Sequence, residues 1–192
     1  MLNAYDILYH FYPDDTPLRR LLILHSEKVR DKALAILAHA KAIDPSPVLC
    51  NIDERLVSDG ALLHDVGIGL THAPGILCEG TEPYICHGTI GAEMLRQFDP
   101  SLEAVARICE RHTGAGLTAQ DITGQGLPIR PVRDLLPETP EERLVCLADK
   151  FFSKSGDPAA EKDFDRVRRS MMKFGTDTLQ RFDALCAEFR VK

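Results

Sequence analysis

The sequence predicts an all-α protein in which residues 1–192 form a single compact helical bundle. Apolar residues recur at spacings of three and four, as on amphipathic helices, whereas few stretches alternate with the period of two that is typical of strands. A chain of 192 residues also suits one domain with its own hydrophobic core. We therefore expect helices packed around one core, with no second domain.

Signals at helix ends divide the first third of the chain into three helices. Pro13 ends a short first helix, and Pro17 suits the first turn of a long second helix, which the DPSP segment at 44–47 breaks. Asp53 can cap a third helix, which the glycines within 67–69 end. These signals place the three helices at residues 2–11, 17–42 and 53–66.

Two long loops and four further helices make up the rest of the chain. Residues 67–85 are rich in glycine and proline and form a longer connection than most, which suggests a functional loop. Residues 117–138 predict a short helical turn followed by a second long loop, and Thr139 with Glu142 forms a capping box for the next helix. The four helices are expected at residues 87–98, 100–113, 139–154 and 158–190.

The composition argues against several classes of protein. A net charge of −6 disfavours a broad nucleic-acid-binding surface but leaves room for a local basic pocket. No apolar run approaches the length of about 18 residues that a membrane helix needs, and the N-terminus lacks the pattern of a secretion signal, so we expect a cytoplasmic protein. The six cysteines include no C-x-x-C pair, so we expect reduced thiols rather than a zinc knuckle or a disulfide framework.

Four histidines and two aspartates lie on or beside the apolar faces of the predicted helices. A single histidine on such a face is more often a hydrogen-bonded core residue than a ligand, and a single aspartate can belong to a buried ion pair. Six of them in one helical domain favour a metal site, because cations neutralise buried carboxylates and accept the lone pairs of imidazoles. The six residues are His25, His64, Asp65, His87, His112 and Asp149.

The order of these residues and their flanking sequences resemble the HD superfamily of metal-dependent phosphohydrolases. The motifs that carry the resemblance are LLILHSEKV, ALLHDVG, CHGTIGAEML, ERHTGAG and RLVCLADKF, which span about residues 18–155. The CHGTIGAEML and ERHTGAG elements are most similar to the branch with two additional histidines, which includes bacterial di-iron diadenosine-tetraphosphate hydrolases. The resemblance therefore implies a bundle of the HD-domain type, and the C-terminal helix predicted at 158–190 follows the matching motifs.

The resemblance also implies a ligand set for two divalent metal ions. His25, His64, Asp65 and Asp149 match the ligands of one ion, His87 and His112 match the ligands that hold a second, and Asp65 is the usual bridge between them. Members of the family use iron, manganese or other divalent ions. A mixed imidazole and carboxylate shell also suits such ions better than magnesium or calcium, which prefer oxygen ligands.

The sequence departs from the family pattern three residues after Asp65. Many relatives carry a basic residue there that can meet a phosphate, and this chain has Ile68. Lys28, one helical turn after His25, and Lys150, next to Asp149, are the preferred replacements, and with Asp65 they form the predicted catalytic set. The further candidates are Arg111, Arg130 and Arg133, for each of which a solvated surface charge is the alternative.

These residues predict a hydrolase that cleaves a phosphoester or phosphoanhydride bond with a metal-activated hydroxide. From the resemblance we expect a small phosphorylated substrate, preferably a nucleotide, with Arg130 and the loop residue His72 as substrate-binding candidates. We expect neither nucleic acid nor membrane as a partner, and a homodimer fits the sequence. Three alternatives remain open: a nucleotide-binding regulator without turnover, a metal-stabilised helical module for partner binding, and a di-iron oxygenase on the same fold.

Overall fold

The computed structural model describes residues 3–192, which form ten α-helices, four single turns of 3-10 helix and three short strands. The α-helices are α1 (Ala4–Phe11), α2 (Pro17–Ile43), α3 (Pro47–Cys50), α4 (Glu54–Leu63), α5 (His87–Phe98), α6 (Glu103–Arg111), α7 (Ala119–Gly124), α8 (Pro140–Asp149), α9 (Phe164–Met172) and α10 (Thr176–Glu188). The 3-10 turns are η1 (Ile68–Leu70), η2 (Pro74–Ile76), η3 (Tyr84–Cys86) and η4 (Pro100–Leu102). The strands are β1 (Thr71–Ala73), β2 (Cys78–Glu79) and β3 (Glu82–Pro83).

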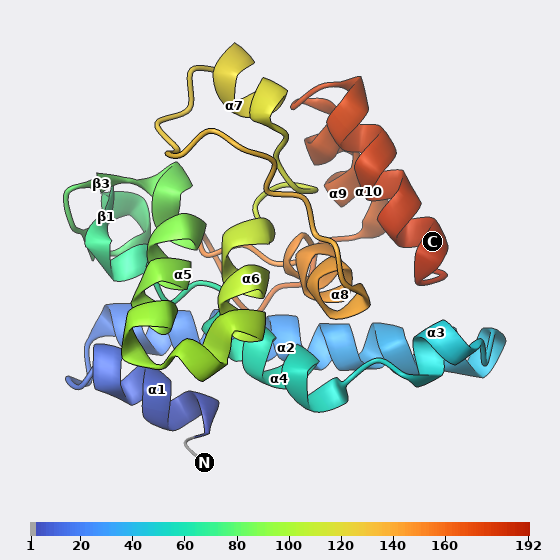
Figure 1. Ribbon diagram of the computed structural model, residues 1–192, viewed down its shortest axis with the longest axis horizontal. Coiled ribbons are helices and arrows are strands. Elements are labelled where there is room, and N and C mark those ends of the chain that lie inside the picture. Colours follow the sequence, from blue (N-terminus) through green and yellow to red (C-terminus); the bar gives the residue numbers. More distant parts are fainter. Residues whose placement is uncertain (1–2) are drawn as a thin grey trace.

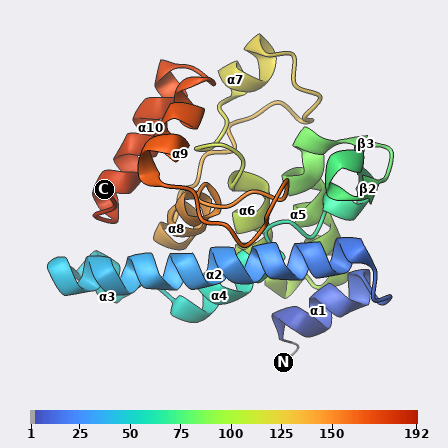
Figure 2. The same cartoon turned by 180° about the vertical axis from the view of Figure 1, so that it is seen from behind.

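The long helix α2 forms one side of the molecule, and the other helices pack along it (Figures 1 and 2). Helix α4 and helix α8 both pack against α2, α6 packs against α4, and α5 packs against α6. Helices α9 and α10 pack against each other beside α8, and α7 lies in the segment that extends away from α2 (Figure 1). No helix within residues 3–192 is long and apolar enough to cross a membrane.

The helix ends follow the capping signals in the sequence. The Thr16 side chain accepts the backbone N–H of Arg19 at the start of α2, and Pro17 occupies the first turn. Asp53 caps α4, and Thr139 and Glu142 form the expected reciprocal capping box at α8. The first helix begins at Ala4, and residue 2 of the predicted range lies outside the described residues.

The all-α prediction is an approximation, because the loop predicted at 67–85 contains a small sheet. Strand β1 lies in its centre, antiparallel to β2 with His72 opposite Glu79, and parallel to β3 with Thr71 opposite Glu82. Strands of two or three residues show too little alternation to be detected from the sequence.

The prediction of one C-terminal helix over 158–190 is wrong. Two helices, α9 and α10, occupy this segment, and the chain between them turns at Gly175 with a φ of 107°. The apolar spacing continues on both sides of the break, so the pattern alone suggests one helix, while the positive φ requires a glycine. The helix predicted over 139–154 likewise ends at Asp149, and residues 150–163 form an irregular linker to α9.

Two apolar clusters form most of the core, and the polar residues of interest lie where they meet. One cluster is built mainly from α2, α4, α8, α9 and α10, and the other from α1, α4, α5 and α6. Along α2, the buried His25 lies between Leu22 of one cluster and Val29 of the other. On α6, Ile108 and Cys109 belong to different clusters, just before His112.

Candidate metal centre

Five structural elements bring the six predicted ligands into one place. The three predicted ligand histidines outside α2 lie at the end or start of a helix: His64 and His112 directly follow α4 and α6, and His87 begins α5. Asp65 follows His64 and is fully buried, and Asp149 ends α8. Helix ends set the direction of a side chain through the cap geometry, so the packing of the helices fixes where these ligands point.

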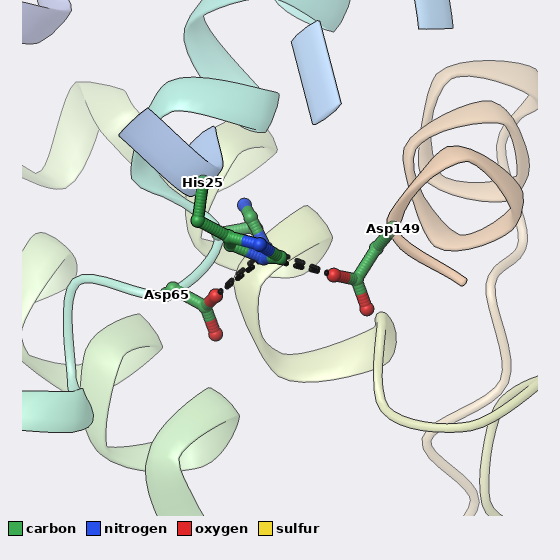
Figure 3. Close-up of side chains that lie close together, drawn as sticks. His25, Asp65 and Asp149 are labelled. Atoms are coloured by element: carbon green, nitrogen blue, oxygen red, sulfur yellow. Dashed lines mark hydrogen bonds and ion pairs between the residues drawn. The ribbon is translucent and has the colours of Figure 1, made fainter. Parts of the chain in front are cut away.

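The first group of ligands surrounds His25 (Figure 3). The Nε2 atom of His25 lies 3.2 Å from Oδ2 of Asp65 and 3.1 Å from Oδ1 of Asp149. The Nε2 atom of His64 lies 2.9 Å from the same Asp65 oxygen and 3.5 Å from the same Asp149 oxygen. Two imidazoles and two carboxylates thus direct one donor atom each toward a common point.

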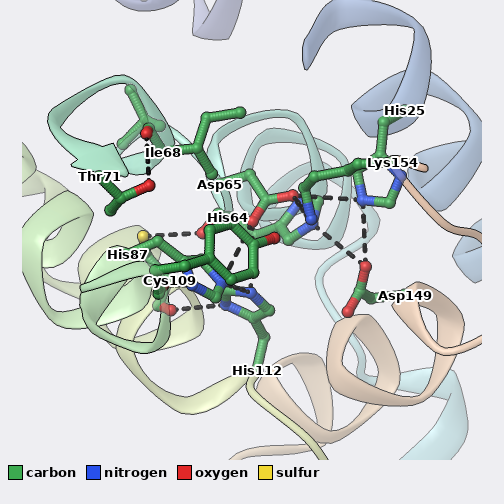
Figure 4. A network of polar contacts seen from close by, with 12 residues as sticks. His25, His64, Asp65, Ile68, Thr71, His87, Cys109, His112, Asp149 and Lys154 are labelled. Carbon is green, nitrogen blue, oxygen red and sulfur yellow. Dashed lines mark hydrogen bonds and ion pairs between the residues drawn. The ribbon is translucent and has the colours of Figure 1, made fainter. Parts of the chain in front are cut away.

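The second group uses the other oxygen of Asp65 (Figure 4). The Oδ1 atom of Asp65 lies 3.4 Å from Nε2 of His87 and 3.5 Å from Nε2 of His112. All donor atoms of a group lie within 4.8 Å of one another in both groups. Because each oxygen of Asp65 belongs to a different group, this carboxylate connects the two.

Backbone carbonyls hold three of the four imidazole rings in orientation. In each case Nδ1 donates to the carbonyl three residues earlier: His64 to Ala61 at 2.7 Å, His87 to Tyr84 at 2.6 Å and His112 to Cys109 at 2.6 Å. A proton on Nδ1 leaves the lone pair on Nε2, and in all three rings Nε2 faces the carboxylates. Such outer hydrogen bonds are the usual way in which proteins fix the tautomer of a metal-binding histidine.

The donor atoms fit a divalent metal ion. The Nε2 atoms of His87 and His112 face each other at 3.0 Å, although each ring already donates from Nδ1. Burial lowers the pKa of His87 to about 3 and also lowers the pKa of His112, so both lone pairs are present at neutral pH. The buried Oδ1 of Asp65, which faces both rings, also has no hydrogen-bond donor among the described residues. A cation satisfies all of these acceptors together.

The charges around the cluster keep both aspartates ionised. Burial raises the pKa of Asp65, but His64 and Lys154 outweigh it and hold that pKa well below the usual range. Lys150 and His25 have the same effect on Asp149, whose side chain is 12% exposed. Burial opposes the charged form of His64, yet the two carboxylates raise its pKa to about 9. Two ionised carboxylates in the core require cationic partners.

The structure places Lys154 in the cluster, a residue that the sequence analysis missed. Its Nζ lies 2.5 Å from Oδ2 of Asp65, and its side chain is 9% exposed (Figure 4). A helix continuing through residue 154 would direct Lys154 about 140° away from Asp149 around the helix axis. Because α8 ends at Asp149, Lys154 lies in the irregular linker, which can return its side chain to the site.

A cavity of about 550 Å³ opens beside the first group of ligands. His25 and Asp149 lie in its wall, together with three lysines, Lys150, Lys154 and Lys162. Lys150 donates to the carbonyl of His112 at 2.9 Å, and its ammonium lies 2.7 Å from Oδ2 of Asp149. The full set of other lining residues is Ala73, Gly75, Ile76, Tyr84, Gly114, Phe152, Ser153, Ser155, Ser170, Met171 and Phe174.

Three other predicted site residues do not line this cavity. Lys28 is half-buried on α2, and His72 is exposed on β1. Arg130 is exposed, donates to the carbonyls of Leu127 and Ile129, and borders a different cavity.

The remaining arginine candidates belong to an ion-pair network away from the cavity. Arg111 is buried and lies 2.7 Å from a carboxylate oxygen of Glu138. The alternative interpretation of Arg111 as a solvated surface charge is therefore wrong. Arg133 pairs with the buried Glu110 at 2.9 Å. Ile68, at the position where many relatives carry a basic residue, is fully buried in an apolar cluster.

The fold and the cluster together define a helical protein whose histidine and aspartate side chains form a group suited to a divalent metal ion. Comparison with protein families gives the same class: the model of the HD domain matches residues 22–153, and the chain belongs to the HD-domain family. The matched range contains all six ligands. The resemblance carried by the sequence motifs is thereby confirmed at the level of the family.

Three curated relatives match over most of this chain. The chain is 39% identical over 132 residues to an uncharacterized protein of Methanocaldococcus jannaschii, covering 67% of this chain and 68% of that one. It is 35% and 34% identical to proteins named tRNA (cytidine(56)-2'-O)-methyltransferase from Picrophilus torridus and Thermoplasma volcanium, over 76% and 77% of this chain. The chain spans only 38% and 35% of those two relatives. No solved structure matches.

Proposed function

We propose that the protein is a metal-dependent phosphohydrolase that cleaves a phosphoester or phosphoanhydride bond of a nucleotide. One observation carries the proposal: a buried six-ligand cluster opens into a cavity whose charged wall residues include three lysines. Imidazole and carboxylate ligands hold divalent cations, and lysines attract the phosphate groups of a substrate. The HD-domain family supports the same chemistry.

The two groups of donors support two ions, with Asp65 between them. The oxygens of Asp65 point to separate sets of imidazoles, His25 with His64 and His87 with His112. The mixed nitrogen and oxygen shell favours iron or manganese over magnesium and calcium. Bound divalent ions would supply the acidity that activates water and would neutralise charge on the phosphoryl group.

The residues of the chain contribute orientation and charge. The backbone carbonyls of Ala61, Tyr84 and Cys109 hold the three imidazoles in the ligating tautomer. Ammonium groups in the cavity stabilise the negative charge that develops on the phosphoryl oxygens and the leaving group. Lys150 is held for this role by the carbonyl of His112, next to the ligand Asp149.

The names of the two methyltransferase relatives do not change the proposal. The chain covers 38% and 35% of those proteins, so most of their length lies outside the shared segment. Transfer of a methyl group needs no cluster of six metal ligands, whereas hydrolysis of a phosphate bond uses such a cluster directly.

Product release tests the proposal, with inorganic phosphate and the nucleotide products both measured, because cleavage of a dinucleoside polyphosphate into two nucleotides frees no inorganic phosphate. Protein stripped of metal and reloaded with iron or manganese is incubated with a panel of nucleotides and dinucleoside polyphosphates, with Asp65→Ala as the matched variant. We expect release that depends on the added metal and disappears in the variant. Absence of both inorganic phosphate and new nucleotide products from wild-type protein holding two ions contradicts hydrolysis, and oxygen consumption by that protein then identifies an oxygenase.

A further inference from the structure

Lys154 pairs with the carboxylate oxygen that the first ligand group shares. Its Nζ lies 2.5 Å from Oδ2 of Asp65, the oxygen that also faces His25 and His64. The position is buried, and burial disfavours a charged amine, yet Asp65 and Asp149 raise the pKa of Lys154 above its usual value. The Lys154 ammonium therefore neutralises Asp65 at Oδ2, the oxygen that would bind a divalent ion.

We propose that Lys154 exchanges between two anions: it pairs with Asp65 when no divalent ion is bound, and it moves to the phosphate of the substrate when the ion binds. The second half of this statement rests on the proposed function. Lys154 is then a substrate-positioning residue whose availability depends on metal loading.

Competition for Asp65 is the first step. A divalent ion and an ammonium are like charges, and at the distances of this cluster their repulsion in a buried site is large. Both need Oδ2 of Asp65, while Oδ1 faces His87 and His112. Binding of the ion to this oxygen therefore removes the partner of Lys154 and repels its ammonium.

The linker gives Lys154 room to move. Residues 150–163 contain no helix or strand. Gly156 within them adopts a φ of 78°, a backbone conformation that residues with a side chain rarely adopt. The side chain of Lys154 already lies in the wall of the cavity of about 550 Å³. It can leave Asp65 without leaving the site.

Once the aspartates bind metal, the lysines in the cavity wall carry positive charge that can attract an anion. Lys162 lies in the same wall, and no carboxylate within residues 3–192 is close enough to form an ion pair with it. Its ammonium donates instead to the carbonyls of Phe152 at 2.5 Å and Lys150 at 3.4 Å. Burial, together with repulsion from Lys150 and Lys154, lowers the pKa of Lys162. These ammonium groups converge on a space suited to a phosphate group.

Metal titration tests the exchange without relying on turnover. Calorimetry measures the affinity of metal-free wild-type protein, Lys154→Met and Lys162→Met for Mn²⁺, and Lys162→Met is the control because Lys162 does not contact Asp65. We expect Lys154→Met to bind Mn²⁺ more tightly by about tenfold, and Lys162→Met to stay within about twofold of wild type. Equal or weaker Mn²⁺ binding by a folded Lys154→Met overturns the proposal.

A second measurement uses the wild-type side chain and so does not depend on the folding of Lys154→Met. The lysine ε-methylene signals are followed by NMR, with the Lys154 signal assigned from its absence in Lys154→Arg. We expect Zn²⁺ to shift this signal, and inorganic phosphate to shift it further only after Zn²⁺ is bound. A Lys154 signal that does not move with Zn²⁺ overturns the exchange.

The outcomes separate this proposal from the proposed function. Tighter Mn²⁺ binding by Lys154→Met, in a protein that releases phosphate from no substrate, supports the competition for Asp65 and contradicts the hydrolase alone. Metal-dependent phosphate release with unchanged Mn²⁺ affinity in Lys154→Met supports the hydrolase and overturns the exchange.

Discussion

The Nε2 atoms of His87 and His112 lie 3.0 Å apart, and each ring donates its Nδ1 proton to a backbone carbonyl. Two lone pairs at this distance repel each other, and because burial lowers the pKa of both rings, no proton lies between them at neutral pH. A cation is the partner that relieves this repulsion. The pair therefore indicates that the second ligand group is built for a metal ion.

Removal of the His87 side chain should abolish metal binding by the second ligand group and leave the first group intact. His87→Ala leaves His25, His64, Asp65 and Asp149 in place, so we expect reconstituted protein to retain one of two ions. Elemental analysis of protein reloaded with manganese gives the stoichiometry. His72→Ala is the control, because His72 is exposed and belongs to neither ligand group. Two ions in His87→Ala would show that this histidine is not a ligand.

The stability of metal-free protein should be greatest near pH 6.5. The pKa of His87 is lowered from 6.5 to about 3, so between these values the unfolded chain binds the extra proton and stability falls as the pH falls. The pKa of His64 is raised from 6.5 to about 9, so here the folded protein binds the extra proton and stability falls as the pH rises. Each proton contributes a slope of at most about 1.4 kcal/mol per pH unit.

Urea unfolding of metal-free protein between pH 4 and pH 9 measures this profile. Metal loading should remove the alkaline decline, because a ligated His64 carries no proton on Nε2. A midpoint that is constant over the whole range contradicts the charge assignment.

Tyr12 should stabilise the turn that carries Asp65. Its hydroxyl donates to the carbonyl of Val66 at 2.7 Å and accepts the N–H of Gly69 at 2.9 Å. Tyr12→Phe removes both bonds, and we expect a loss of about 1–2 kcal/mol in the free energy of unfolding, or about 2–8 °C in Tm. The matched variant Tyr9→Phe alters an exposed tyrosine and should leave Tm unchanged. Equal Tm values for the two variants would exclude this role.

Gly67 should tolerate no side chain. A Cβ at this position would meet the carbonyl oxygen of His87 and approach the backbone nitrogen of Gly91 to 2.5 Å. Gly67→Ala must push α5 away from the turn after Asp65, so we expect a loss of about 3 kcal/mol in stability and weaker metal binding. Gly75→Ala places its Cβ in open space and should match wild type in both measurements. Thermal melts and Mn²⁺ titration check the pair of variants.

The six residues of the cluster could be predicted from the sequence because each one lies on or beside an apolar helical face. The fold class was predictable for the same reason, since the helix periods and the caps at Thr16, Asp53 and Thr139 are local signals. Lys154 gave no such signal, because it comes from an irregular linker whose path depends on tertiary packing. The break at Gly175 was not predicted because the apolar spacing continues on both sides of it, and the short strands were not predicted because they show too little alternation. The positions of Lys28, His72 and Arg130 relative to the cavity also depend on packing that the sequence does not display.

The most direct test of the account is the electron paramagnetic resonance spectrum of protein reloaded with Mn²⁺, with the bound metal counted in the same sample. We expect two ions per chain that are magnetically coupled, because one carboxylate, Asp65, connects the two ligand groups. Asp65→Asn should abolish the coupling. A single ion per chain, or two uncoupled ions in the wild-type protein, would contradict the bridged centre.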